Sequence, residues 1–528
     1  MSRIHDEKKE RFSRLCALII LGLTLIFMAF LLPMAFIRTT GMSTGAAGTL
    51  GEVVSFNRDN VFLNLIVLAI TAAGAYLVFR LCELVPLRSV VLALVGYTLI
   101  FGMAFVLSAK LQPSEDSYIV SFFARQAARG DVSYYHEYFR FFPFQFGFVM
   151  YEEAFFRLFY LILPNAPEGY SSLALQGLNV IYICVCYVSL VAVAGYAFEN
   201  EAAQRFTAIL FFFFLPAVLM ATYMYGNIPA LACSCGALWC FFKFHAAGRP
   251  VWGLMCALLL ALAVCLKLNS LIFVVAIVLV WLILLIKRPR LSSALCLALT
   301  LAAVVALRAL PQQYYERRCG ESFGGGIPQL SWMAMGMSEG KSCSGWYDTR
   351  YTADAYKAAG YDRAETERAA RAAIDARLDY FASEPTEARR FFSRKLLSQW
   401  NEPTFQGLWN NQVRKKYSDP GVLYSLVCVR LARRLTQLMN YYQQLIYFMF
   451  TLGLMSLLRR RSIRSALLPL IILGGLLYHL LFEAKSQYAL GYFMLMIPVA
   501  ACGLARISER VGGAGKDNRN GNKKRYGA

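Results

Sequence analysis

The chain has 528 residues, of which 58% are hydrophobic and only 16% are charged, and its mean hydropathy is +0.48. This composition excludes an ordinary soluble domain and is typical of a polytopic membrane protein, in which helices satisfy the backbone inside the bilayer. The formal net charge of +21 would suggest nucleic-acid binding in a soluble domain. Its placement beside apolar runs indicates membrane topology instead, so we expect no nucleic-acid partner.

Twelve apolar runs approach the ~20 residues that cross a bilayer as a helix. In chain order they cover residues 15–37, 61–81, 89–109, 173–198, 206–220, 228–242, 251–266, 271–286, 291–307, 441–458, 466–482 and 489–504. We therefore predict an all-α membrane protein with about 12 transmembrane helices. The first run lacks a small-residue cleavage pattern, which indicates a retained helix rather than a signal peptide.

Lysine and arginine are retained in short cytoplasmic loops, so their positions predict the orientation of the chain. Basic clusters occur at the amino terminus, at 287–290, at 459–464 and in the carboxyl-terminal tail. With 12 crossings these clusters share one side, which predicts a multi-pass protein of the cell membrane with both termini in the cytoplasm. We interpret the clusters as topology signals and assign them no catalytic role.

This topology divides the chain into six regions. They are a three-helix membrane segment (1–109), an outer loop with an acidic motif (110–170), a transmembrane core (171–310), an outer, mainly helical domain (311–440), carboxyl-terminal transmembrane helices (441–505) and a basic cytoplasmic tail (506–528).

The outer loop is expected to contain helices that lie along the membrane surface. From Tyr118 onward, aromatic side chains occupy one helical face, and Arg125 lies on the other. A second apolar stretch after Pro143 is interrupted by charges such as Glu152, which favours an interfacial or re-entrant helix over a further span. The charge-rich middle of the 311–440 section has helical periodicity and predicts a small helical domain.

Unusual polar residues gather in the loops of the predicted outer face. They are the pair Glu115-Asp116, YMYGN at 223–227, LKLNS at 266–270, the 311–440 section and EAKSQY at 483–488. A loop that only connects helices needs little more than turn residues. Acids, amides, lysines and tyrosines at one interface therefore indicate a functional site there.

Eight motifs in order carry a resemblance to a known family. They are Asp116, Gly130-Asp131, FFPFQFG (141–147), Tyr225 to Pro229, LKLNS, SWMAMGMSEGKSCSGWYDT (331–349), FSRKLLSQWNEPTF (392–405) and FEAKSQYALGYF (482–493). Together they resemble the bacterial membrane glycosyltransferases of the GT-C fold, which are related to the protein mannosyltransferases of glycosyltransferase family 39. The resemblance runs from about Lys110 to Leu504.

Two features depart from the family pattern. Gln487 stands where the family usually has an arginine, and Lys485 is the nearby residue that would supply the charge. Three apolar runs precede the acidic motif, whereas better-known members have one, so two helices look added at the front. We assign no function to these added helices.

The resemblance implies a glycosyltransferase that moves a hexosyl or pentosyl group from a polyprenyl-phosphate donor to an acceptor on the extracytoplasmic face of the cell envelope. The acceptor would be a glycan, a protein or a cell-wall polymer. Asp116 would be the general base that takes the proton of the acceptor hydroxyl, and direct displacement would invert the anomeric configuration. Glu115 would tune Asp116 or bind the acceptor.

Cations at the interface would hold the donor phosphate. The candidates are Lys267, Lys485, Arg125, Arg140 and the pair Arg317-Arg318. The full set of expected substrate-binding residues is Arg125, Arg140, Tyr225, Asn227, Lys267, Asn269, Trp332, Trp346, Glu483, Lys485 and Tyr488.

Simpler interpretations exist for several of these residues. Pro-Ser-Glu-Asp is also favourable chemistry for a helix amino terminus, so Glu115 and Asp116 could be a solvated cap. Tyr225, Trp332 and Trp346 could be aromatic residues of the membrane interface rather than platforms for a sugar.

Most of the 14 cysteines lie in apolar runs, where a thiol behaves as a small apolar side chain. Cys319 and Cys343 differ because both fall in the outer section, and we predict that they form a disulfide. Only four histidines are present, so we predict no zinc site. No cofactor is certain, and a divalent cation, Mg²⁺ or Mn²⁺, that bridges Asp116 and the donor phosphate is left open.

Three other classes of function compete with this hypothesis. A lipid or glycan transporter or flippase would place ionisable residues near the membrane midplane and often shows repeated halves. A polymerase or ligase of lipid-linked polysaccharide would share the sidedness, but usually relies on an outer loop rich in arginine and histidine. A non-enzymatic scaffold is the remaining alternative.

Overall fold

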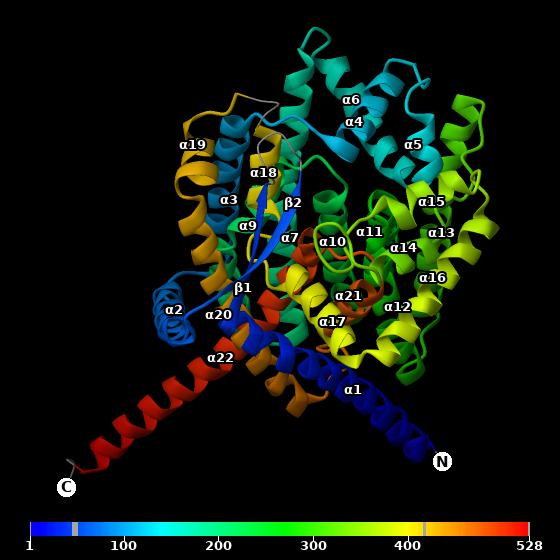
Figure 1. Cartoon of the computed structure of the whole chain (residues 1–528). Helices are drawn as coiled ribbons and strands as arrows, with labels where there is room; N and C mark the ends of the chain where they lie inside the picture. Colours follow the sequence, from blue (N-terminus) through cyan, green and yellow to red (C-terminus); the bar gives the residue numbers. More distant parts are fainter. Residues whose placement is uncertain (1, 45–50, 416–418, 526–528) are drawn as a thin grey trace.

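The computed structural model describes residues 2–44, 51–415 and 419–525, with side chains described from Glu7 to Glu509. The described chain is almost entirely helical, as predicted (Figure 1). The exception is an antiparallel hairpin of β1 (Arg38–Thr44) and β2 (Glu52–Arg58), in which Thr44 lies opposite Glu52. The sequence analysis did not predict this hairpin.

Eight helices of the described chain are long and apolar enough to cross a membrane. They lie within α1 (Ser2–Ile37), α2 (Val61–Cys82), α3 (Leu87–Ala109), α7 (Glu168–Phe198), α10 (Asn227–Ala247), α12 (Leu271–Lys287, with the preceding turn from Leu268), α13 (Leu291–Cys319) and α22 (Ser486–Arg525). A ninth span is formed if α8 (Glu201–Phe212) and α9 (Leu215–Leu219), which are bent by 50°, count together.

The prediction of 12 spans is not confirmed. Two of the apolar runs form short helices, α11 (Pro250–Leu266) with 17 residues and α21 (Leu467–Leu481) with 15 residues. A third lies within α20 (Ala432–Arg460), where Gln443 and Gln444 are buried and donate to main-chain carbonyls of α17 and α1. Its hydropathy is lowered by these amides, which the interior of the bundle accommodates through hydrogen bonds.

Short helices cover one end of the bundle, opposite both chain termini in the view of Figure 1. They include α4 (Glu115–Ala128), α5 (His136–Phe141) and α6 (Phe146–Ile162). The side chains of Phe123, Phe139 and Phe146 form the buried centre of this group. Glu153 of α6 is buried and paired with Arg318 of α13, which fixes the group to the membrane core.

The section from 311 to 440 is mainly helical, as expected, although α13 continues through its first residues. Its helices are α14 (Gln329–Gly336), α15 (Ala353–Ala358), α16 (Arg363–Ser383), α17 (Pro385–Trp400), α18 (Gly407–Arg414) and α19 (Val422–Ser425). The predicted basic tail is described only as a continuation of α22, because its side chains beyond Glu509 lie outside the described part of the chain.

Candidate functional site

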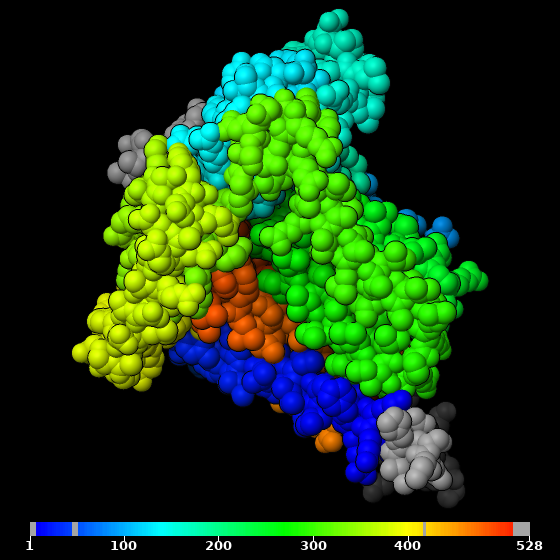
Figure 2. All heavy atoms as spheres, turned by 90° about the vertical axis from the view of Figure 1, so that its right-hand side faces the viewer, coloured from blue at the N-terminus to red at the C-terminus, as the bar shows by residue number. Residues whose placement is uncertain are grey.

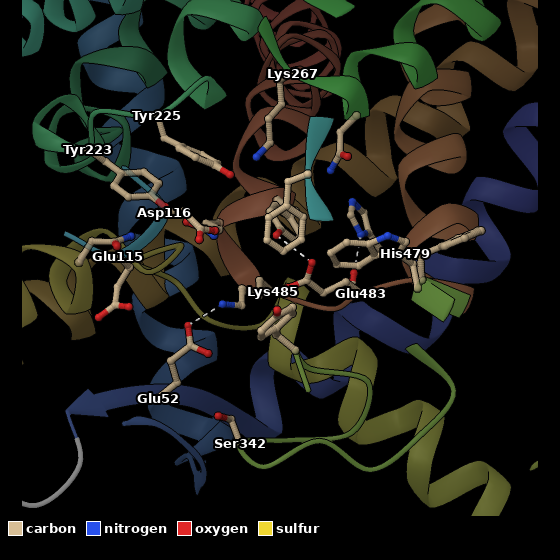
Figure 3. Close-up of a pocket in the computed structure, with 18 of the residues that line it drawn as sticks. Glu52, Glu115, Asp116, Tyr223, Tyr225, Lys267, Ser342, His479, Glu483 and Lys485 are labelled. Atoms are coloured by element: carbon tan, nitrogen blue, oxygen red, sulfur yellow. Dashed lines mark hydrogen bonds and ion pairs between the residues drawn. The ribbon is translucent and has the colours of Figure 1, made fainter. Parts of the chain in front are cut away.

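A cavity of about 650 Å³ lies at this end of the bundle, where loops meet the helices α4, α14, α18 and α21 (Figure 3). Figure 2 shows the surface hollowed above α21, between α16 and α17 in yellow and α12 and α13 in green. Nine of the predicted site residues line this cavity: Glu115, Asp116, Tyr225, Lys267, Asn269, Trp332, Glu483, Lys485 and Tyr488. Residues from five distant parts of the sequence therefore meet in one place.

Asp116 lies in the first turn of α4, two residues after the helix cap. Ser114 is the cap, and its main-chain nitrogen donates to the Ser117 hydroxyl at 3.1 Å. Glu115 has a φ of +51°, a left-handed conformation that costs roughly 1 kcal/mol or more for a residue with a side chain. Glu115 and Asp116 therefore form the start of a helix, which agrees with their interpretation as a helix cap. Both side chains also face the cavity.

The Asp116 carboxyl is open to the cavity yet surrounded by protein. This separation from bulk water raises its pKa above the ordinary value. The positive charges of Lys485 and Lys267, and the nearby Tyr138 hydroxyl, act in the opposite direction. A carboxylate with a raised pKa is a better proton acceptor than one with an ordinary pKa, which suits a general base.

Lys267 follows α11 and points into the cavity from the loop before α12. The helices approach closely here: a Cβ at Gly226 would lie 2.2 Å from the Leu266 carbonyl oxygen. The Lys267 ammonium lies 4.1 Å from the centre of the Tyr225 ring, a cation–π contact. Burial lowers the pKa of Lys267 to about 8, against the favourable charges of Glu483 and Asp116.

Lys485 occupies the centre of the cavity and is paired with a carboxylate that the sequence analysis did not single out. Its Nζ lies 2.9 Å from Oε1 of Glu52 on the hairpin. Burial opposes the charge on Lys485, but Glu52 and Glu483 outweigh burial and hold its pKa above the ordinary value. The hydroxyl of Tyr488 donates to Glu483 at 3.1 Å, and burial raises the pKa of that carboxyl.

Arg414 at the end of α18 is a second lining residue that the sequence analysis missed. It is fully buried, and its guanidinium donates to the carbonyl and hydroxyl oxygens of Thr222 at 2.6 and 3.0 Å and to the Asn410 carbonyl at 2.9 Å. No carboxylate pairs with it among the described residues. It therefore adds positive charge to the wall of the cavity while it fixes α18 to the loop before Tyr223.

Several predicted contacts lie elsewhere. Arg125 is paired with Glu168 at 3.1 Å and lies over the Phe156 ring, and Arg140 is paired with Glu321, so both are structural. Neither side chain lines the cavity.

Trp346 and the pair Arg317-Arg318 of the outer section also lie outside the cavity lining. Trp346 is fully buried and donates to Ser398 at 2.9 Å, so it is neither a sugar platform nor an interface residue. Arg318 of the Arg317-Arg318 pair is used by Glu153 of α6, and neither residue lines the cavity.

Asn227 lines a smaller neighbouring cavity of about 70 Å³ rather than the main one. Lys267, Asn269 and Tyr488 line both cavities, so the two adjoin. The Oδ1 atom of Asn227 is buried and has no hydrogen-bond partner in the described chain.

The predicted disulfide is not formed. Cys319 at the end of α13 packs near Val132 in the cluster of the surface helices. Cys343 packs with Trp346 and Ala484 in a different buried cluster, and both thiols are free. The two thiols are kept apart because each packs in a different cluster.

Among the described residues, no group of three or more His, Cys, Asp or Glu side chains gathers as a metal cage. A cation shared between Asp116 and a donor phosphate would need fewer protein ligands and stays a prediction.

Residues 121–314 match the family of dolichyl-phosphate-mannose-protein mannosyltransferases. This match confirms the predicted resemblance to the protein mannosyltransferase superfamily for the core of the chain. It includes Tyr225 and Lys267 but begins after Asp116. No curated protein sequence matches the chain.

Among solved structures, the chain is similar to the archaeal oligosaccharyltransferase AglB from Archaeoglobus fulgidus, solved in complex with an inhibitory peptide and a dolichol-phosphate. The TM-score is 0.38 and the sequence identity is 12%, over 82% of this chain and 52% of that one. The chain thus spans about half the length of that protein.

Proposed function

We propose that the protein is a membrane glycosyltransferase that transfers a sugar from a polyprenyl-phosphate donor to an acceptor hydroxyl on the extracytoplasmic face, with inversion at the anomeric carbon. Asp116 is the general base, and Lys267 is the principal cation for the donor phosphate. The observation that carries the proposal is the convergence of Asp116, Lys267 and Lys485 in one cavity at the end of the bundle. The family match over 121–314 supports the class of reaction.

The proposed step needs one base and one anion-binding group. The acceptor oxygen forms a bond to the anomeric carbon while the bond from that carbon to the phosphate oxygen breaks. The acceptor proton passes to Asp116, and the leaving polyprenyl phosphate keeps the electron pair of the broken bond. Because the phosphate leaves as a stable anion, no second acid is required, and attack from the face opposite the phosphate inverts the configuration.

Lys267 suits the phosphate better than Lys485 does. The Lys485 ammonium is already paired with Glu52, whereas Lys267 makes no ion pair among the described residues and lies over Tyr225. Lys267 also borders the smaller cavity between α10, α12 and α22, which has Leu231 and Phe273 in its wall. Apolar walls next to the phosphate site are the surroundings that a polyprenyl chain requires.

The same arrangement supports the proposed sidedness. Both chain termini lie at the opposite end of the bundle from α4, α5 and α6 (Figure 1), and the amino terminus is rich in lysine and arginine. Under the positive-inside rule the termini are cytoplasmic, so the cavity opens on the extracytoplasmic side.

The test is release of polyprenyl phosphate from a panel of polyprenyl-phosphate sugars by the purified chain in lipid, with crude envelope acceptors. Asp116→Asn keeps the size of the side chain but removes its basicity, so turnover should fall by at least about 100-fold while donor binding persists. The matched control is Asp354→Asn, because Asp354 is also in the first turn of a helix but is exposed and far from the cavity lining. It should behave as wild type.

Loss of turnover in both variants, or full turnover in Asp116→Asn, would remove Asp116 from the role of base. Neither binding nor turnover with any donor in the wild type would refute the transferase proposal and favour transport of a lipid-linked glycan.

A further inference from the structure

The hairpin before the second span reaches into the cavity. Gly51 and Glu52 belong to its lining, on the same cavity wall as Lys341 and Ser342. The hairpin lies in the amino-terminal segment, well before the region 121–314 that matches the family. The added front of the chain therefore supplies part of the site.

Strand alternation directs Glu52 inward. Side chains at every second position share one face of a strand, so Glu52, Val54 and Phe56 point the same way. Val54 and Phe56 pack against the buried cluster of Trp346 and its neighbours, and the intervening Val53, Ser55 and Asn57 are exposed. The burial of two apolar residues thus fixes the direction of the carboxylate.

The hairpin is also held by its other strand. The main-chain nitrogen of Thr40 donates to the Asn401 carbonyl at 3.0 Å, and its hydroxyl donates to the Leu397 carbonyl at 2.9 Å. Asn401 returns a hydrogen bond to the Arg38 carbonyl at 2.6 Å. These bonds fix the hairpin to the end of α17, so the position of Glu52 is set by the fold.

Among the described residues, hydrogen bonds reach only one oxygen of Glu52. Oε1 accepts from Lys485 at 2.9 Å and from the Gln406 amide at 3.2 Å. Oε2 accepts no hydrogen bond within the described part of the chain. A mostly buried carboxylate oxygen beside a cavity is an available acceptor for a ligand.

The negative charge of Glu52 decides which ligand its Oε2 atom would bind. In Figure 3, Glu52 and Ser342 lie at the end of the view opposite Lys267, with Lys485 between. A carboxylate repels the donor phosphate, which the proposed function places beside Lys267. The hairpin end is therefore left for the acceptor.

We infer that Glu52 is an acceptor-binding residue and that the acceptor is a carbohydrate with at least two hydroxyl groups within reach of the site. One hydroxyl gives its proton to Asp116, and another donates to Oε2 of Glu52 while Lys485 holds Oε1. A serine or threonine acceptor has one hydroxyl, which Asp116 would occupy, so it would have no second hydroxyl for Glu52. This inference rests on the proposed function.

The test compares Glu52→Gln and Glu52→Ala with wild type in lipid. Donor-site affinity is measured with polyprenyl phosphate through tryptophan fluorescence, because Trp332 and Trp409 line the cavity. Acceptor use is measured as transfer to an envelope carbohydrate fraction, and the same fraction after glycan removal tests protein acceptors. Glu83→Gln is the control, since Glu83 lies in the same segment, is exposed and pairs only with Arg80.

Both Glu52 variants should raise the acceptor KM by about tenfold or more, the loss expected for a hydrogen bond to a charged group. The polyprenyl phosphate Kd should stay within about twofold of wild type or become tighter, because the lysines remain. Glu52→Gln has nearly the same shape as wild type, so it should lower the thermal unfolding temperature less than Glu52→Ala does, although both lose the ion pair with Lys485.

Three results would overturn the inference. The first is an unchanged acceptor KM in Glu52→Gln. The second is a parallel loss of polyprenyl phosphate affinity, which would show that Glu52 acts only by holding Lys485. The third is transfer that survives glycan removal from the acceptor fraction. An active wild type with any of these results refutes the role of Glu52 alone. A wild type without turnover on every donor refutes the proposed function and this inference with it.

Discussion

The pH dependence of Lys267 gives the most direct test of the proposed phosphate site. Burial lowers its pKa to about 8, from an ordinary value near 10.5. Only the protonated lysine carries the charge that holds a phosphate. The charged fraction is about 90% at pH 7 and about 10% at pH 9 for a group with this pKa. Turnover at low donor concentration should therefore fall about tenfold between these two pH values.

The substitution Lys267→Arg keeps the positive charge but removes its titration in this pH range. Arginine stays protonated throughout this range, so the alkaline fall in kcat/KM should disappear or move above pH 10. The control is Lys357→Arg, because Lys357 is exposed, pairs with Glu137 and lies outside the cavity lining. It should keep the wild-type profile. The assay is polyprenyl phosphate release from pH 6 to 10. A wild-type rate that is flat up to pH 9.5, or an alkaline limb retained in Lys267→Arg, would refute the assignment of Lys267.

Three further predictions concern the framework of the site. Gly226→Ala should lower donor affinity and thermal stability, because its Cβ would clash with the main chain of α11, whereas Gly74→Ala has open space and should be neutral in the same melting and fluorescence assays. Lys395→Met should destabilise the chain by about 3 kcal/mol in denaturant unfolding, because two buried carbonyls lose their donor, and an unchanged midpoint would contradict this. Mass spectrometry after alkylation in denaturant without a reducing agent should find Cys319 and Cys343 both labelled, and a mass shift that needs prior reduction would restore the disulfide.

The sequence predicted the centre of the site because membrane topology limits where polar loops can lie. Asp116, Lys267 and Lys485 are far apart in the chain, but each follows or precedes an apolar run at the same predicted face. Only a few loops share that face, so their unusual residues had a good chance of meeting. The structure brings these three together in one cavity.

The same reasoning could not rank residues within the large outer section. Trp346 and Arg125 have the chemistry of ligand contacts, yet Trp346 is a core residue and the buried Arg125 pairs with the partly exposed Glu168. Residue type does not tell which face of a helix meets the cavity. Arg414 was not predicted, because its short helix resembles any other polar stretch. Only its packing against Thr222 brings it to the wall of the cavity.

The role of Glu52 could not be predicted from the sequence, because it depends on the register of the hairpin and on where the hairpin packs. The alternation of Glu52, Val54 and Phe56 is readable in the sequence, but it predicts a strand only if a partner strand and a surface exist to receive it. The partner strand is β1 nearby in the chain, but the surface is supplied by residues such as Asn401, far away in the chain. A loop between two spans thus became part of the site through contacts that no local pattern indicates.

The charges around Asp116 connect these observations to the order of events. Lys485 and Lys267 both lower the pKa of Asp116, and so restrain its basicity. A donor phosphate beside Lys267 would offset one of these positive charges, while Glu52 already offsets the other. Under the proposed function, the pKa of Asp116 therefore rises when the donor binds, because each lysine then faces an anion of its own. The base would become most effective only after the sugar to be transferred is in place. Such coupling would disfavour proton abstraction from an acceptor that arrives alone.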